Sequence, residues 1–227
     1  MKVGVIGAGR IGGNAGRLLA RAGHAVMFSF ARSEDSLARA AAAAGESATT
    51  GTPADAIAFG EVIVFAVPWR AIDEALHEAG YLAGKVILDT TNQFGADGIV
   101  ELPDGMSAAE FNARRMSGAG YVKSLNTLTA GFQAEAAERP PGERVAMFLG
   151  GDDADAKRIV SELIADMGFE PVDVGGFGEI WIMEAPRRDG AVYGEEYRPA
   201  DARKIAALVR DDPERASSLA GALRVGG

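Results

Sequence analysis

Short apolar runs alternate along the chain with longer segments whose apolar residues recur at helical spacing. The first run, residues 2–7, is rich in β-branched side chains and predicts a strand. In the segment that follows, Ile11, Leu18 and Leu19 recur at helical spacing until Gly23, which predicts a helix. Similar runs predict further strands at residues 24–30, 61–68, 85–92, 120–127 and 144–151, and helical segments at 33–45, 68–80 and 153–168.

The strand runs are nearly continuously apolar rather than alternating, which is typical of a sheet covered on both faces. Strands that alternate with helices predict an α/β fold. We therefore expect a Rossmann-type, doubly wound and mostly parallel sheet, followed by a short C-terminal appendage.

The composition changes near Gly175, where the chain becomes rich in glycine, proline and charge. We place a Rossmann-type domain at 1–175 and an appendage at 176–227, with a short helix at 200–210. The appendage is too short to form an independent core. It carries apolar and aromatic side chains, namely Trp181, Met183, Tyr193 and Tyr197. We therefore expect one of two arrangements. Either the appendage packs across a two-fold partner, forming a homodimer and part of the wall of the substrate site, or it wraps its own subunit.

Composition narrows the classes of function. The formal charge of −9 argues against a nucleic-acid or anionic-membrane surface. The chain has no cysteine and only two histidines, His24 and His77, so we expect no metal site and no catalytic triad. The N-terminus begins directly with a strand, without the features of a signal peptide, and no apolar run approaches the length of a membrane span. We expect a cytoplasmic, soluble protein.

Gly7, Gly9 and Gly12 form a G-x-G-x-x-G pattern between the first strand and the first helix. In a dinucleotide site the first glycine allows the tight turn and the second lets the backbone approach the pyrophosphate. The third lets the helix pack against the strand. The helix N-terminus supplies N–H donors for the phosphates. A glycine-rich turn without a ligand is the alternative.

The end of the second strand indicates which dinucleotide binds. An NAD site usually carries an acid there for the ribose 2′-hydroxyl, whereas this chain has Ser29 and Phe30. Arg32 and Ser33 follow, and a guanidinium beside a hydroxyl suits a 2′-phosphate. We therefore favour NADP(H) over NAD, although Glu34 and Asp35 can compete for Arg32.

Five segments in this order and spacing resemble the coenzyme F420-dependent NADP oxidoreductase family, a relative of the N-terminal domain of pyrroline-5-carboxylate reductase. They read MKVGVIGAGRIGG, SFARSEDSL, FAVPWRAI, LDTTNQF and VKSLNTL. The resemblance covers about residues 1–174. It implies binding of NADP(H) and transfer of hydride to or from a second ring, with coenzyme F420 as a co-substrate.

The resemblance also implies roles for individual residues. Ala8, Gly9, Arg10 and Ile11 match the phosphate turn, and Ser29, Arg32 and Ser33 match the 2′-phosphate clamp. Ala66, Val67 and Pro68 match the strand end beside the nicotinamide ribose. Asn92 matches the next strand end, and residues 126–130, from Asn126 to Ala130, match the segment bordering the nicotinamide.

Two features depart from the family pattern. Gln93 stands where the family often has proline, and the segment after Gly175 does not match the archaeal deazaflavin-binding tail. The second substrate therefore stays open.

Hydride transfer between two rings needs no protein nucleophile, so we name no catalytic residue. Lys123 is open to a catalytic or a structural role, and we favour the structural one. The main expectation is an NADPH-dependent oxidoreductase acting on a deazaflavin or flavin-like ring. An imine, ketone or hydroxy-acid reductase is the second, and a nonenzymatic NADPH-binding sensor is the third.

Overall fold

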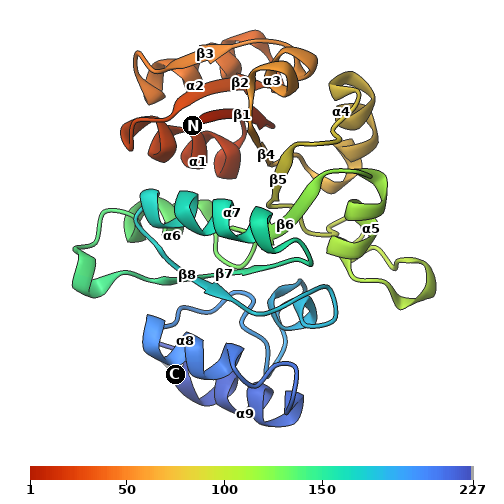
Figure 1. Ribbon diagram of the computed structural model, residues 1–227, viewed down its shortest axis with the longest axis vertical. Helices are drawn as coiled ribbons and strands as arrows, with labels where there is room; N and C mark the ends of the chain where they lie inside the picture. The colour runs from red at the N-terminus through yellow and green to blue at the C-terminus, as the bar shows by residue number, and fades with distance from the viewer. Residues whose placement is uncertain (226–227) are drawn as a thin grey trace.

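Eight strands form one sheet in the order β3-β2-β1-β4-β5-β6-β7-β8 in the computed structural model, which describes residues 1–225 (Figure 1). All neighbouring strands are parallel except β6 and β7, which pair antiparallel. The order and directions confirm the expected Rossmann-type sheet. The strands are β1 Lys2–Ile6, β2 Ala25–Ser29, β3 Ala48–Thr50, β4 Val62–Phe65, β5 Val86–Asp89, β6 Gly120–Ser124, β7 Ala146–Gly150 and β8 Glu170–Asp173.

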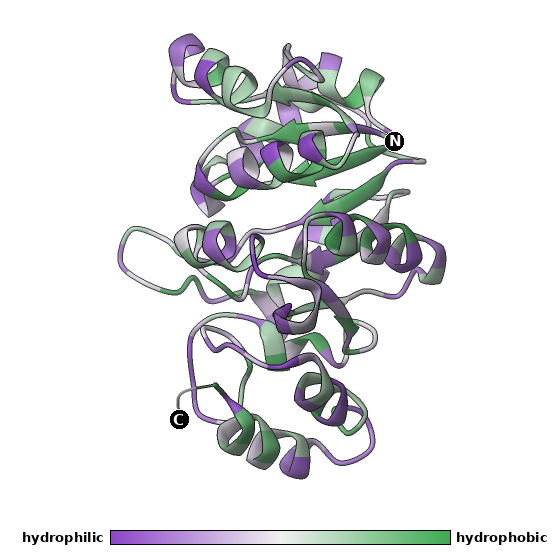
Figure 2. Ribbon diagram, turned by 90° about the vertical axis from the view of Figure 1, so that its left-hand side faces the viewer, coloured by the Kyte–Doolittle hydropathy of each residue, from purple (hydrophilic) through white to green (hydrophobic). Residues whose placement is uncertain are grey.

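Helices cover both faces of the sheet, and each face has its own hydrophobic core. One face carries α1 Arg10–Arg21, α2 Glu34–Ala44, α6 Ala130–Ala136 and α7 Ala154–Asp166. The other carries α3 Pro53–Phe59, α4 Ile72–Ala79, α5 Ala108–Arg115, α8 Pro199–Ala206 and α9 Pro213–Leu223. Figure 2 shows apolar strands inside and polar outer surfaces on many of the helices. This two-sided burial explains why the strands read as continuous apolar runs.

Five parallel strands end at the same edge of the sheet. Ile6 pairs with both Ser29 and Phe65, Phe65 pairs with Asp89, and Asp89 pairs with Lys123. The last residues of β1, β2, β4 and β5 and the second-last residue of β6 are therefore level with one another. The loops that follow these strands meet along one edge, where open α/β sheets bind their ligands.

The C-terminal segment, residues 176–225 and called the tail below, packs against its own chain. It begins with the 3₁₀ turn η4, Ile180–Met183, and ends with α8 and α9. Ile182, Tyr197 and Ile205 are buried in the same core as Phe148 of β7 and Val172 of β8. Figure 1 shows α8 and α9 beside the β7–β8 end of the sheet. The tail thus extends one of the two cores of the sheet, while the domain boundary at residue 175 stays a prediction.

Two short strands and four helices were not among the elements expected from the sequence: β3, β8, α3, α5, α6 and α9. The expected helix at 200–210 is α8, which ends at Ala206, earlier than expected. Three further 3₁₀ turns connect the main elements: η1 Trp69–Ala71, η2 Pro103–Gly105 and η3 Pro141–Glu143. No helix within residues 1–225 has the length and apolar character needed to cross a bilayer.

Candidate functional site

The turn between β1 and α1, residues 7–12 and called the phosphate turn below, uses its three glycines in two ways. A Cβ on Gly7 would lie 2.5 Å from the carbonyl oxygen of Ala66, and Gly7 has a φ of +103°. A Cβ on Gly12 would lie 2.1 Å from the carbonyl oxygen of Gly7. A Cβ on Gly9 would meet nothing within 4 Å. Gly7 and Gly12 are therefore required for packing, whereas the space beside Gly9 is open to a ligand.

The N-terminus of α1 is available to an anion. Its N-cap, Gly9, provides no side-chain cap, and its first turn contains no acidic residue. By contrast, α2, α5 and α7 are capped by Ser33, Ser107 and Asp153. The first N–H groups of a helix need partners, and together they carry a partial positive charge. The α1 terminus thus has the character of a phosphate-binding site.

The residues expected to hold a 2′-phosphate differ in exposure. Arg32 and Ser33 are exposed after β2, and Ser33 caps α2 by accepting a hydrogen bond from the Ser36 amide. Among the described residues the Arg32 guanidinium has no ion-pair partner, so neither Glu34 nor Asp35 occupies it. Ser29 is fully buried, and its hydroxyl donates to the Val5 carbonyl at 3.0 Å. In this structure Ser29 supports the strand end, while Arg32 and Ser33 face solvent.

Ala66, Val67 and Pro68 follow β4 beside the phosphate turn. The Ala66 amide donates to the Ile6 carbonyl at 2.8 Å, and the Ala66 carbonyl approaches Gly7 closely. Val67 is buried and Pro68 is exposed. The loop after β4 therefore packs directly against the phosphate turn. Ala66, Val67 and Pro68 do not line the cavity at the strand ends.

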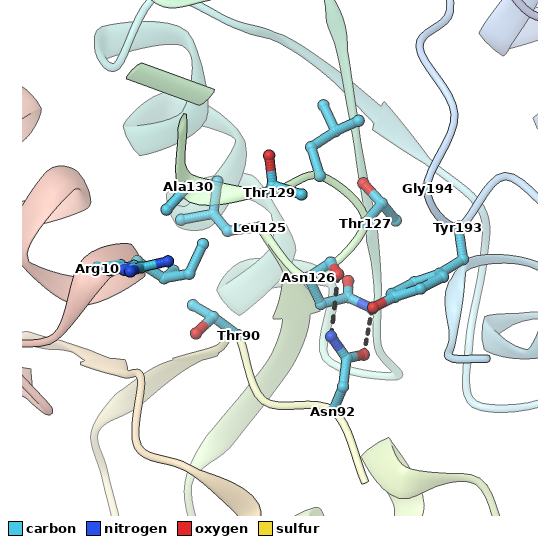
Figure 3. Close-up of a pocket in the computed structure, with 12 residues that line it drawn as sticks. Arg10, Thr90, Asn92, Leu125, Asn126, Thr127, Thr129, Ala130, Tyr193 and Gly194 are labelled. Atoms are coloured by element: carbon cyan, nitrogen blue, oxygen red, sulfur yellow. Dashed lines mark hydrogen bonds between the residues drawn. The ribbon is translucent and has the colours of Figure 1, made fainter. Parts of the chain in front are cut away.

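A cavity of about 330 Å³ lies at the carboxyl ends of β1, β5 and β6, and is called the strand-end cavity below (Figure 3). It joins Arg10, Ile11 and Asn92 with the whole predicted segment from Asn126 to Ala130. Its volume falls in the range of small-molecule sites. Its remaining lining residues are Thr90, Leu125, Tyr193 and Gly194.

A pair of asparagines connects two loops at the wall of this cavity (Figure 3). The Asn92 Nδ2 donates to the Asn126 carbonyl at 3.0 Å, and the Asn126 Nδ2 donates to Asn92 Oδ1 at 3.2 Å and to the Met183 carbonyl at 2.8 Å. Asn126 is only 4% exposed, and its Oδ1 has no hydrogen-bond partner among the described residues. A buried acceptor without a partner is costly. A ligand N–H, such as that of a carboxamide, would satisfy it.

Gln133 fixes the loop that carries Asn126. Its Nε2 donates to the carbonyls of Leu125 and Leu128 at 2.9 and 2.8 Å, and the side chain is buried. Leu125 has a φ of +57°, a conformation that non-glycine residues rarely adopt. The loop is thus held from inside the protein. The sequence did not point to Gln133, because a single glutamine on a helix carries no distinctive signal.

A buried polar network lies beneath the cavity, centred on Asp89 at the end of β5. The Asp89 carboxylate accepts from the Thr91 amide at 2.8 Å, from Asn112 Nδ2 at 3.0 Å and from the Tyr121 hydroxyl. Lys123 is fully buried, donates to the Thr91 carbonyl and lies 3.5 Å from Asp89. Burial, together with the Asp89 charge, raises the pKa of Tyr121 well above its usual range. Lys123 does not line the cavity, and these contacts give it a structural role.

The two histidines lie away from the cavity. His24 is buried, with Nε2 2.9 Å from Asp166 and Nδ1 3.2 Å from the N-terminal amine. His77 is exposed on α4. Within residues 1–225 no group of three or more histidine, aspartate or glutamate side chains could hold a metal ion.

A second, more open hollow of about 450 Å³ lies between α1 and α2, and it reaches the phosphate turn at Ala8 and Gly9. Ser36 and the cations Arg17 and Arg39 are among its lining residues. The two hollows therefore lie on either side of the α1 N-terminus. These features fit the polar groups of NADP(H). The phosphate turn and the uncapped N-terminus of α1 suit the pyrophosphate, Arg32 suits the 2′-phosphate, and Asn126 Oδ1 suits the carboxamide.

A model of a known family matches the N-terminal part of the chain. Residues 2–93 match the family model described as NADP oxidoreductase, coenzyme F420-dependent. A 131-residue stretch is 30% identical to the metalloreductase STEAP3 of Rattus norvegicus and covers 58% of this chain. The chain spans about a quarter (26%) of the length of that curated relative.

Solved structures resemble a larger part of the chain. A hypothetical protein from Sinorhizobium meliloti is 26% identical with a TM-score of 0.76, over 86% of this chain and 94% of the other. A putative F420-dependent NADP-reductase from Arthrobacter sp. FB24 is also 26% identical, with a TM-score of 0.65 over 78% and 86%. An imine reductase from Myxococcus stipitatus is 20% identical, with a TM-score of 0.59 over 78% of this chain and 55% of the other, and shows the fold alone.

Proposed function

Because residues 2–93 match the family model described as NADP oxidoreductase, coenzyme F420-dependent, we propose that this protein is an NADPH-dependent oxidoreductase. In this proposal it transfers hydride between NADPH and a second acceptor, a deazaflavin such as coenzyme F420 or a flavin-like ring. The family match and the likeness to the Arthrobacter protein support the cofactor and the class of reaction.

The observation that carries the proposal is the position of the strand-end cavity. One wall comes from Arg10 and Ile11 of the phosphate turn, and the opposite wall comes from Tyr193 and Gly194 of the tail. A dinucleotide on the turn would extend toward this cavity, so a second molecule there would lie beside its nicotinamide. Placing two reactants next to each other is the main contribution a protein makes to a cofactor's reaction.

The residues of the chain divide the work of binding. The α1 N-terminus holds the pyrophosphate, Arg32 and Ser33 hold the 2′-phosphate, and Asn126 Oδ1 accepts from the carboxamide. NADPH, when bound, supplies the reducing hydride. Leu125 and Leu128 line the cavity with apolar surface, which excludes water from the acceptor.

A second function is favoured by a different observation. Tyr193 places a phenolic hydroxyl in the cavity wall, and reduction of an imine or ketone needs a proton donor at the acceptor. The chain therefore also suits a small imine or ketone. Because the tail does not match the archaeal deazaflavin-binding tail, both classes of acceptor are tested in the same assay.

Absorbance at 340 nm tests these functions directly. The protein is mixed with NADPH and, in separate reactions, a deazaflavin, flavin mononucleotide, 1-pyrroline and cyclohexanone. Rapid oxidation with the deazaflavin or the flavin supports the first function, and oxidation with the imine or ketone supports the second. Tight NADPH binding by calorimetry without turnover of any acceptor would instead identify a nonenzymatic sensor.

Expectations about assembly and location belong to the proposal. We propose a homodimer that binds a small molecule and neither nucleic acid nor membrane, and a cytoplasmic location. Light scattering of the purified chain tests the first, and cell fractionation tests the last.

A further inference from the structure

Tyr193 is the proton-bearing acid of the strand-end cavity. Among the described residues that line it, ionisable side chains belong only to Arg10 and Tyr193. An arginine stays protonated at any ordinary pH, and the threonine and asparagine side chains are not acids in this range. If a lining side chain gives up a proton to a bound molecule, Tyr193 is the group able to do so.

The backbone on both sides of Tyr193 is fixed to the rest of the protein. The Val192 amide donates to the Ile182 carbonyl at 2.8 Å. On the other side, the Gly194 amide donates to the Thr127 carbonyl, also at 2.8 Å. Thr127 is itself part of the cavity wall, so the tail is attached to the loop after β6 at the point where it meets the cavity.

The ring of Tyr193 is oriented by its neighbours. It packs against Phe94, with ring centroids 6.4 Å apart and planes inclined by 50°. Figure 3 shows the ring extending from the tail toward the Asn92–Asn126 pair, with its hydroxyl end on the cavity side. The amide pair, which we assign to the nicotinamide, and the phenol therefore lie on the same side of the cavity.

Tyr193 carries its proton at neutral pH, because a phenol ordinarily ionises only near pH 10. The side chain is half-buried, and this raises the pKa of Tyr193 above its ordinary value. The phenol therefore enters the reaction in its neutral form as a donor. It loses its proton only to an atom that is gaining negative charge.

We propose that Tyr193 donates a proton to the acceptor as the acceptor is reduced, an inference that rests on the proposed oxidoreductase function. In the balanced step the acceptor gains a hydride from NADPH at carbon and the phenolic proton at a conjugated nitrogen or oxygen. The O–H bond of Tyr193 breaks, a new N–H or O–H bond forms, and NADPH leaves as NADP⁺. The phenolate regains its proton from water.

This role restricts the class of acceptor. The electrophilic carbon must be conjugated to a nitrogen or oxygen that can reach the Tyr193 hydroxyl while the carbon faces the nicotinamide. The walls formed by Ile11, Leu125 and Leu128 favour an apolar body, and Arg10 favours an anionic substituent. The substrate class is thus an unsaturated C=N or C=O compound, cyclic or open, with a flat apolar body.

Tyr193→Phe tests the role because it keeps the ring beside Phe94 and removes only the hydroxyl. With the acceptor that wild type reduces best among those that take hydride at carbon (the deazaflavin, 1-pyrroline and cyclohexanone), we expect kcat to fall 100- to 1,000-fold, the usual contribution of a general acid. The dissociation constant of NADPH, measured by calorimetry, should change less than twofold. Binding of the oxidised acceptor in the presence of NADP⁺ should weaken three- to tenfold, as expected for one lost hydrogen bond.

Tyr81→Phe is the matched control, because Tyr81 is 82% exposed and lies outside the cavity. It should leave all three measurements at wild-type values. A Tyr193→Phe variant that keeps kcat within threefold, or that loses NADPH affinity, would overturn the proton-donor role. A wild-type protein that binds NADPH but reduces no acceptor of the panel would instead overturn the proposed function itself.

Discussion

The two walls of the strand-end cavity are built in different ways. The phosphate turn lies within six consecutive residues; Gly12 packs against the Gly7 carbonyl inside the turn, and Gly7 packs against the Ala66 carbonyl that follows β4. The opposite wall, Tyr193 and Gly194, is held by contacts to distant segments, such as the bond from the Gly194 amide to the Thr127 carbonyl. A single substitution can therefore alter the wall formed by the phosphate turn, whereas the position of the tail wall, formed by Tyr193 and Gly194, depends on how the whole tail packs.

The difference also separates cofactor binding from acceptor binding. The predicted phosphate and 2′-phosphate contacts all lie before residue 34, on α1 and at the end of β2. The tail enters the site through Tyr193 and Gly194 in the cavity wall and through the Met183 carbonyl, which accepts from Asn126 Nδ2. We therefore expect variants of the turn to change NADPH binding, and variants of the tail to change the acceptor or the stability of the tail.

The largest expected effect distinguishes two glycines within the turn. Gly9→Val places a side chain in the open space beside the α1 N-terminus, where we expect the pyrophosphate. NADPH affinity should fall at least about a thousandfold, about 4 kcal/mol, as measured by calorimetry. The urea midpoint should remain close to that of wild type, because a Cβ at Gly9 meets no atom within 4 Å.

Gly12→Val is the matched control with the opposite outcome. Its Cβ would lie 2.1 Å from the Gly7 carbonyl oxygen, so the turn or α1 must move. We expect a loss of about 4 kcal/mol or more in the free energy of unfolding. If Gly9→Val retained tight NADPH binding, the dinucleotide would not lie on this turn.

The same distinction explains what could be predicted from the sequence. The G-x-G-x-x-G turn and Arg32 are recognisable because their determinants are contiguous and follow a predicted strand. Continuous apolar runs predicted the strands for the same local reason. β3 and β8 were not predicted, because they are the edge strands and contain few buried apolar residues, whereas the similarly short β4 and β5 are apolar and buried.

The tail wall could be predicted only in outline. The aromatic residues of the tail suggested a wall for the acceptor, and Tyr193 does line the cavity. Its neighbours Thr127 and Phe94 are far away in sequence, so no spacing rule connects them. Lys123 illustrates a different case: its position near the site left a catalytic role open beside the favoured structural one, and its burial beside Asp89 supports the structural role.

The second expected effect concerns the choice of cofactor. Arg32→Ala removes an exposed cation that has no ion-pair partner among the described residues. NADPH binding should weaken by about 1.5–3 kcal/mol, the scale of charge-assisted hydrogen bonds, while NADH binding stays nearly unchanged. Arg158→Ala, which removes an exposed cation on α7, is the control and should change neither. If Arg32→Ala weakened NADPH and NADH binding equally, Arg32 would not bind the 2′-phosphate.

The smallest expected effect tests the tail alone. The Tyr197 hydroxyl donates to the Ala220 carbonyl at 2.7 Å, and its ring packs edge-on against Phe148 with centroids 5.7 Å apart. Burial, with a smaller contribution from the Glu195 charge, raises the pKa of Tyr197 to about 12. An unfolded tyrosine ionises near pH 10, so the folded chain binds this proton more tightly.

The stabilisation from this proton is therefore complete below about pH 10 and is lost as the pH rises to about 12. We expect the free energy of unfolding to fall by about 2 kcal/mol over this range, measured by urea denaturation. Tyr197→Phe lacks the ionisable group, so the difference between the two proteins isolates this contribution from the titration of lysines and other tyrosines. Because Ala220 lies on α9, loss of the bond loosens the tail wall and leaves the phosphate turn intact. Parallel pH profiles for wild type and variant would show that Tyr197 does not couple the tail to the sheet in this way.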